Sequence, residues 1–593
     1  MRTRKAKDRS RLIQAAMGQI PCDLTIGNVQ FFNAITGEIY PASVDILDGF
    51  VVLVREEGQE AVLPSKSYYD GQGRYLIPGY IDTHMHIEST MMIPENLARA
   101  ILPWGTTTIC TDPHEIGNVM GLDGVRFMLE NAKKSKLRQY VLAPSCVPSL
   151  PGMENAGAEF HAKEVGELLD MDDVVGIAEI MDYVGVMHDS ERMHTIIDEG
   201  LRRGMFLQGH APYCSGRELA AYLIGGPVSD HESVNADEVR GKLRAGMHIN
   251  LRASSLIDNL SFLVDGCKDQ PWRDFVSVCT DDVHAKDLLT VGHINNVVRK
   301  AVASGLDGRE VVKMATLNAA REYGFDDLGA IAPGYIADMQ LVDALDGSCP
   351  KAVFTEGVLV AEDGKYLGGD CMTGGYDLPN TVNMPQITGP ESFVLRVPEG
   401  YTGDTIRVNV MVSEDGNRIL RHVEPVELPV RDGAVDISGD PTLVFVCCAN
   451  RYGRGGKTIA VYRDFGLRAG ALASTISHDS HNFTVSYHDP KDAFRAAEIL
   501  RACGGGVCVI DGAEETHIAL PAAGLMSQKP CAEVADEIAA VQAALDAISG
   551  GRLTLLATAV MALPVLPSVV ITDMGLVNGT NQTFVPVFAD AEA

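Results

Sequence analysis

The sequence predicts an α/β protein organised around a (β/α)8 barrel, with a small β-domain built from both flanks and an α+β domain at the C-terminus. Two observations support this fold class. Between residues 76 and 335, short apolar runs typical of buried strands alternate with helical stretches about eight times. Metal-binding side chains directly follow several of these runs, which is where a barrel of parallel strands places its chemistry.

Short strand signals separated by turns appear on both sides of the barrel, which favours one sheet assembled from two segments. The expected units are an N-terminal helix over 1–20, a small β-domain over 21–75 plus 336–384, the barrel over 76–335 and the C-terminal domain over 385–593. Within the last unit we expect strands such as 392–397 and 442–446, and a final helix over 532–548.

Composition and charge restrict the partners. The 593 residues carry a formal charge of −30, which argues against nucleic acid or an anionic membrane as a partner, because both need a basic surface. No run of about 18 apolar residues is present to span a membrane. The 13 cysteines include no Cys-x-x-Cys pair, so we expect reduced thiols in a cytoplasmic protein.

The first strand of the barrel carries a pair of histidines. Pro78 and Gly79 precede the alternating run Ile-Asp-Thr-His-Met-His, residues 81–86. A strand has a side-chain period of two, so His84 and His86 share one face. Neutral imidazoles suit Zn, Fe and related ions, and the pair is therefore predicted to form one edge of a metal site.

Four further metal-capable residues follow later strands: Glu179, His210, His231 and Asp281. With the histidine pair they are predicted to hold two ions, with Glu179 bridging them. Two ions would lower the pKa of a bridging water, supply a hydroxide nucleophile and polarise the substrate. Asp281 would carry the proton from nucleophile to leaving group. A structural role is the alternative for any single residue, but six at successive strand ends favour the metal centre.

The second strand ends in Thr-Asp-Pro-His-Glu, residues 111–115, at the same rim of the barrel. We expect Asp112, His114 and Glu115 to contact the substrate or to support the metal ligands, the alternative being a capped turn. Glu154, after the third strand, and Arg252, after the seventh, are further candidates for substrate contact.

A loop of the C-terminal domain, Ser-His-Asp-Ser-His-Asn at 477–482, is dense in metal-capable side chains. One interpretation is that it reaches over the barrel mouth and completes the site through His478, Asp479 and His481. The other is a loop held by its own hydrogen bonds.

The motif Pro-Gly-x-Ile-Asp-x-His-x-His and the later ligand positions resemble the amidohydrolase superfamily. More narrowly, seven motifs resemble the bacterial adenine deaminases, and the resemblance covers nearly the whole chain. They are Thr-Asp-Pro-His-Glu-Ile-Gly-Asn at 111–118, Gly-His-Ala-Pro at 209–212, Ser-Asp-His-Glu-Ser at 229–233, Cys-Thr-Asp-Asp at 279–282, Gly-His-Ile at 292–294, the loop at 477–482 and Ala-Gly-Leu-Met-Ser at 523–527.

This resemblance implies hydrolytic deamination of adenine to hypoxanthine and ammonia in purine salvage, at a binuclear centre of Mn, Fe or Zn, in a homo-oligomer. Glu115 is then expected beside Asp281 in catalysis and as the main contact to the purine. One departure bears on substrate preference. The family usually shows Arg-Glu-Gly-Ser after the seventh strand, whereas here Arg252 precedes Ala253, Ser254 and Ser255.

Two other functions fit the same pattern. One is a different hydrolase on the same barrel, such as another aminopurine deaminase, a cyclic amidase or a deacetylase. Many cyclic amidases of the superfamily bridge their metals with a carboxylated lysine, whereas Glu179 already supplies a carboxylate. The other is a non-catalytic binding protein, which the six intact ligand positions disfavour. A metal assay combined with purine turnover separates the three.

Overall fold

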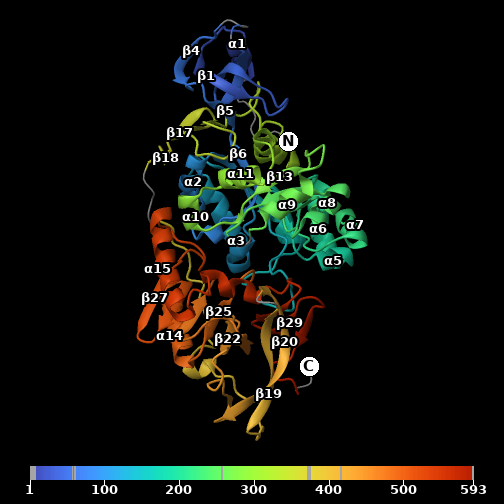
Figure 1. Cartoon of the computed structure of the whole chain (residues 1–593), viewed down its shortest axis with the longest axis vertical. Coiled ribbons are helices and arrows are strands. Elements are labelled where there is room, and N and C mark those ends of the chain that lie inside the picture. Colours follow the sequence, from blue (N-terminus) through green and yellow to red (C-terminus); the bar gives the residue numbers. More distant parts are fainter. Residues whose placement is uncertain are drawn as a thin grey trace.

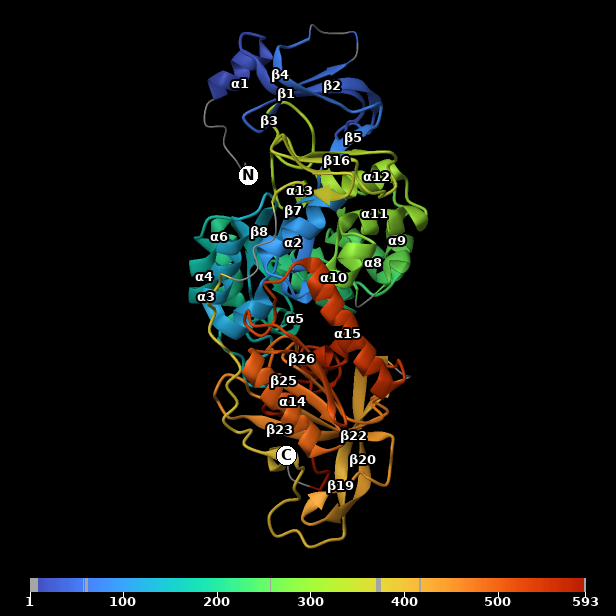
Figure 2. The same ribbon diagram turned by 90° about the vertical axis from the view of Figure 1, so that its left-hand side faces the viewer.

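The chain forms three units stacked along its long axis (Figures 1 and 2). A computed structural model describes residues 9–590, apart from 57, 59–61, 256–257, 370–374 and 415–416. A small sheet domain lies at one end, the barrel in the middle and the C-terminal domain at the other end. The predicted fold class is confirmed.

The described residues form eight barrel strands in chain order. They are β6 (Tyr80–His86), β7 (Thr106–Thr111), β8 (Arg138–Ala143), β9 (Val174–Ile180), β10 (Phe206–Gly209), β11 (Ser229–Asp230), β12 (His248–Arg252) and β13 (Val276–Cys279). Parallel pairing joins β6 to β10 and β11 to β13, and the Val228 N–H donates to the Leu207 carbonyl between the two sets. The ring closes where β14 (Asp281–Asp282) pairs in parallel with β6.

Helices alternate with these strands. They are α2 (Pro94–Ile101), α3 (His114–Ala132), α4 (Ala162–Leu169), α5 (Tyr183–Met187), α6 (Glu191–Arg203), α7 (Gly216–Ile224), α8 (Ala236–Arg244), α9 (Leu260–Cys267), α10 (Ala285–Thr290), α11 (Ile294–Ala303), α12 (Gly308–Lys313) and α13 (Ala319–Glu322), with single turns η1 (Glu88–Thr90), η2 (Leu102–Trp104) and η3 (Met314–Asn318). Helix α6 illustrates how the sequence sets the start, the end and the buried face of these helices. The Ser190 hydroxyl accepts the Met193 N–H at its start, and Gly204 ends it at φ 65°. Met193, Ile196 and Ile197 form its buried stripe.

The small sheet joins both flanks of the barrel, in the order β18-β17-β16-β15-β5-β1-β2-β3 with β4 beside β1. Its strands are β1 (Cys22–Phe32), β2 (Ile39–Leu47), β3 (Phe50–Glu56), β4 (Ser65–Asp70), β5 (Tyr75–Pro78), β15 (Met339–Val342), β16 (Ala352–Thr355), β17 (Val358–Glu362) and β18 (Lys365–Tyr366). Antiparallel pairing of β5 with β15 connects the two segments. Helix α1 (Arg9–Ala16) lies in the expected N-terminal helix, of which residues 1–8 are outside the described residues.

The C-terminal domain contains a nine-stranded sheet, ordered β21-β20-β19-β23-β22-β25-β24-β26-β27, and a three-stranded sheet, β28 to β30. Its elements are β19 (Thr405–Glu414), β20 (Asn417–Arg431), β21 (Ala434–Val435), β22 (Leu443–Ala449), β23 (Lys457–Arg463), β24 (Ala471–Ser474), β25 (Phe483–Tyr487), β26 (Gly506–Asp511), β27 (Glu514–Ala519), β28 (Val569–Thr572), β29 (Gly575–Asn578), β30 (Thr583–Val585), α14 (Pro490–Cys503), α15 (Cys531–Ser549), η4 (Pro390–Phe393) and η5 (Leu555–Ala562). The prediction of a strand at 392–397 is wrong. Pro390, whose fixed φ suits the first turn of a helix, begins η4 there instead.

The C-terminal domain packs on the barrel through a shared apolar core. Helix α15 lies beside α10 (Figure 2), and the Cys531 thiol contacts the Ala285 carbonyl at 3.5 Å. Met92 and Ile101 from the barrel belong to the same buried cluster as Val534 of α15. Among the described residues, no helix is long and apolar enough to cross a membrane.

Candidate active site

The two histidines of β6 form the floor of the site. The His84 Nδ1–H donates to the Gln208 side-chain oxygen at 2.9 Å, and the amide nitrogen of Gln208 donates to the Thr83 carbonyl. The His86 Nδ1–H donates to the Asp112 carbonyl at 3.2 Å. Because the proton of each neutral ring is on Nδ1, where it makes these hydrogen bonds, the lone pair of each ring is on Nε2 and faces the site.

Glu179, at the end of β9, lies between the two histidine pairs. Its Oε1 is 3.3 Å from His86 Nε2 and 4.0 Å from His84 Nε2. Its Oε2 is 2.5 Å from His210 Nδ1 and 3.2 Å from His231 Nε2. Two ligands that each lie about 2.0–2.2 Å from one ion are about 3–3.5 Å apart. One carboxylate oxygen therefore faces each pair, with His86 and His231 at a spacing that suits metal ligands and His210 Nδ1 at hydrogen-bond distance.

Asp281 closes the site from the start of β14. Its Oδ1 lies 3.5 Å from His84 Nε2 and 3.2 Å from His86 Nε2, while its Oδ2 accepts a hydrogen bond of 2.8 Å from Arg252 Nη1. Its φ of 61° lies in the left-handed region, which Asp tolerates better than most residues. Burial would raise the pKa of Asp281, but Arg252 and the two histidines hold it well below its usual range.

The donor atoms suit divalent metal ions. His84 Nε2 is buried, has no hydrogen-bond partner and faces two carboxylates. Burial and the nearby His84 lower the pKa of His231 to about 4, so this imidazole is neutral, as a ligand must be. Nitrogen and carboxylate donors in this arrangement are typical of transition-metal sites. The structure thus brings together all six residues that the sequence singled out as ligands.

A cavity of about 400 Å³ lies above these ligands, between the barrel mouth and the C-terminal domain. His86, Glu179, His210 and Asp281 are on its barrel side. The opposite wall is apolar and comes from η5 and the segment after it: Leu556, Ala557, Val560, Leu563, Val565, Leu566 and Pro567. A flat, partly apolar molecule that also carries polar edges would match these two walls.

Comparison with known proteins agrees with this geometry. The amidohydrolase family matches residues 75–360, and the adenine deaminase C-terminal domain matches residues 418–583. Adenine deaminase 2 of Carboxydothermus hydrogenoformans is 37% identical over 97% of this chain and 99% of its own length. The chain belongs to the adenine deaminase family. The adenine deaminase of Methanothermobacter thermautotrophicus is 38% identical over 93% of this chain and 97% of its own length. The predicted family resemblance is confirmed.

In this adenine deaminase family member, Glu232 is a pocket residue that the sequence analysis missed. Arg252 Nη1 donates to Glu232 Oε1 as well as to Asp281, so the guanidinium links two carboxylates on the pocket wall. The available signal was the position of Glu232 directly after His231 at a strand end. Ala253, the residue after Arg252, is buried.

Of the other barrel residues predicted to contact the substrate, some line the pocket and some lie outside it. His114 lines the pocket, and its Nδ1–H donates to Asp112 Oδ2 at 2.9 Å. Glu115 is not among the residues that line the described pocket, and contacts Ser89, His478 and His481 instead. Glu154 accepts the Ser149 hydroxyl at 2.7 Å within its own loop and is likewise not among the pocket-lining residues.

The loop at 477–482 reaches the barrel mouth, where His478 and Asp479 line the pocket. The amide of Asn482 donates to the Asn155 carbonyl of the barrel at 2.8 Å, and Arg451 donates to the His481 carbonyl. Within the loop, the Ser477 N–H donates to His481 Nδ1, so the loop has its own hydrogen bond and also forms part of the pocket wall. His481 lies deeper, beside Glu115.

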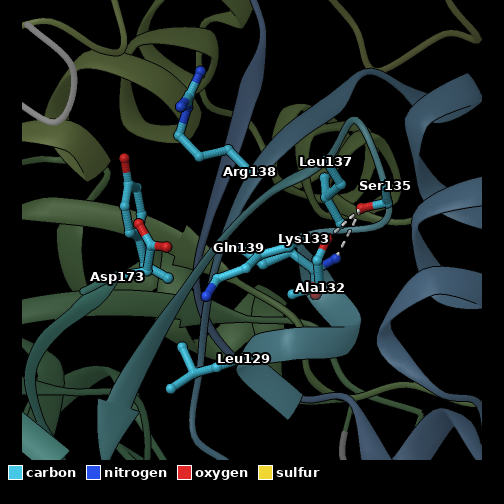
Figure 3. A pocket seen from close by; sticks show the side chains of 9 residues that line it. Leu129, Ala132, Lys133, Ser135, Leu137, Arg138, Gln139 and Asp173 are labelled. Carbon is cyan, nitrogen blue, oxygen red and sulfur yellow. Dashed lines mark hydrogen bonds between the residues drawn. The ribbon is translucent and has the colours of Figure 1, made fainter. Parts of the chain in front are cut away.

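A second hollow, of about 280 Å³, lies at the amino-terminal end of β8 (Figure 3). Arg138 and Gln139 come from the start of that strand, and Arg138 pairs with Asp338 and Glu356. The metal-capable residues follow the opposite, carboxyl ends of the strands. This hollow is therefore separate from the candidate active site.

Proposed function

We propose that this chain catalyses the hydrolytic deamination of adenine, in which adenine and water give hypoxanthine and ammonia, a reaction of purine salvage. The observation that supports it most is Glu179, with one oxygen toward His84 and His86 and the other toward His210 and His231. These five residues and Asp281 would hold two divalent ions of Mn, Fe or Zn. Such ions lower the pKa of water and polarise the bound substrate.

Asp281 is the proposed proton carrier. Arg252 holds one of its oxygens, so the carboxylate has a fixed orientation beside His84 and His86. In our proposal it accepts the proton of the water that adds to the purine carbon and returns it to the departing amine. The apolar wall from η5 would limit the access of other water to this exchange.

Glu232 and Arg252 are the proposed contacts to the purine edge. A carboxylate accepts a ring N–H, and a guanidinium donates to a ring nitrogen. This assignment replaces Glu115 as the main purine contact, because Glu115 lies beside His478 and His481 instead of among the pocket-lining residues. Glu115 then acts as a support for the loop.

Ammonia release from a panel of bases tests the proposal. We expect turnover of adenine, and a kcat/KM for adenosine that is at least about 10⁴-fold lower. In adenosine the ribose is attached to the ring nitrogen whose N–H would donate to Glu232. Cytosine, which lacks the second ring, should also be poor. The Asp281→Asn variant, purified in the same way, controls for contaminating deaminases. Faster turnover of adenosine or cytosine than of adenine would contradict adenine as the substrate. It would still be consistent with a metal-dependent hydrolase.

A further inference from the structure

Three metal-capable side chains outside the six-residue site meet where the barrel touches the C-terminal domain. His114 comes from the start of α3, and His478 and Asp479 come from the loop at 477–482. His114 Nε2 lies 3.5 Å from Asp479 Oδ1, and His478 Nδ1 lies 3.8 Å from the same oxygen. The three residues are 2%, 7% and 2% exposed. We call them the interdomain cluster.

The hydrogen bond behind His114 decides which of its atoms faces this cluster. The His114 Nδ1–H donates to Asp112 Oδ2 at 2.9 Å, so Nε2 is the ring nitrogen that faces Asp479 and is available to a metal ion. His114 Nε2 faces Asp479 Oδ1, and both His114 Nε2 and the second oxygen of that carboxylate, Asp479 Oδ2, are buried without a hydrogen-bond partner. Buried lone pairs this close to each other are unfavourable unless a cation lies between them.

The spacing favours a metal ion over a proton as that cation. A separation of 3.5 Å is long for an N–H···O hydrogen bond, whose usual range is about 2.7–3.2 Å. It is close to the about 3.5 Å that separates two ligands on one tetrahedral ion. A carboxylate behind the histidine, as Asp112 is here, is also the usual arrangement for a metal-binding imidazole.

We propose that His114, His478 and Asp479 bind a divalent transition-metal ion in addition to those held by the six-residue site. Glu115 Oε1, 3.6 Å from His478 Nδ1, is within reach as a fourth donor. His481 is excluded as a ligand. Its Nδ1 accepts the Ser477 N–H, so its Nε2, 3.8 Å from Glu115 Oε2, carries the proton and has no lone pair for a metal ion.

An ion at this position would join the two domains. Its ligands come from α3 of the barrel and from the loop that forms part of the pocket wall. The ion would therefore fix the loop against the barrel mouth, and its loss would loosen that wall without removing any of the six other ligands.

Metal content per chain tests this proposal. We would load the full-length wild type, Asp479→Asn, His478→Ala and the control His422→Ala with Mn²⁺, remove free metal and count ions by elemental analysis. His422 is a half-exposed histidine that also pairs with carboxylates in the C-terminal domain. Both cluster variants should contain about one ion fewer per chain than the wild type and His422→Ala. Circular dichroism of each variant checks that it is folded.

Two results would overturn the proposal. One is unchanged metal content in folded Asp479→Asn and His478→Ala, and the other is loss of all ions from both, which would mean that the loop only supports the six-residue site. Glu179→Gln separates the two metal assignments. It should lose ions of the six-residue site and keep the one bound by the interdomain cluster. Full metal content in Glu179→Gln would contradict the proposed active-site ligands. It would not contradict the metal site proposed at the interdomain cluster.

Discussion

Single hydrogen bonds decide what each metal-capable residue can do. Gln208 and the Asp112 carbonyl fix the rings of His84 and His86 so that Nε2 faces the site. By the same reasoning, the Ser477 N–H takes the lone pair of His481 Nδ1 and leaves the proton on Nε2, so His481 is not a ligand. Residue type alone does not distinguish these cases, because the tautomer is set by the partner of the other ring nitrogen.

At the residue scale, Asp281→Asn should lower kcat by at least about 10²-fold, because the amide cannot accept a proton in the transition state. Arg252 Nη1 can still donate to the remaining side-chain oxygen, so the local structure should persist. Steady-state kinetics on adenine with metal analysis of the same sample checks this. Turnover close to wild type would exclude Asp281 as the proton carrier.

At the element scale, helix α8 holds the ends of two ligand-bearing strands. Lys242 of α8 is fully buried, and its Nζ donates to Asp230 at 2.9 Å, to Glu238 at 2.7 Å and to the Ala211 carbonyl at 2.7 Å. Asp230 precedes His231, and Ala211 follows His210. One ammonium group therefore positions the backbone beside two candidate ligands.

Lys242→Met should destabilise the protein by about 3–5 kcal/mol, because it leaves two buried carboxylates without their cation. The measurement is the urea midpoint of the metal-loaded protein. Lys268→Met removes an exposed lysine that pairs with Asp265, and should leave the midpoint unchanged. Equal midpoints for the two variants would show that the buried group contributes little.

At the scale of the whole molecule, the pocket depends on how the C-terminal domain docks. The carboxylate of Asp573 accepts two hydrogen bonds from Asn155, one from the backbone N–H at 3.0 Å and one from the side-chain amide at 2.8 Å. Asn155 in turn accepts the amide of Asn482, at the end of the loop that lines the pocket. The barrel loop after β8 thus connects two parts of the C-terminal domain.

Asp573→Ala should raise the KM for adenine by about tenfold, since hydrogen bonds to a charged group contribute about 1.5–3 kcal/mol each. The kcat should fall less, because the six-residue site lies in the barrel. Asp590→Ala removes an exposed partner of Arg407 and should behave as wild type. An unchanged KM in Asp573→Ala would mean that this contact does not hold the pocket wall.

The sequence by itself determined the barrel and its six candidate ligands, because strand alternation and the order of strand ends are local properties of the chain. His84 and His86 share a face for that reason alone. The strand expected at 392–397 failed because its apolar residues outweighed the helix-start signal of Pro390.

Only the tertiary structure decided which other residues reach the pocket. Glu115 and Glu154 carry the same chemistry as Glu232, yet only Glu232 is among the residues that line the described pocket. The difference depends on contacts between segments far apart in the chain, such as His478 with Glu115, separated by more than 350 residues. Sequence periodicity describes how a segment faces its own core, and it holds no information about which distant loop will cover it.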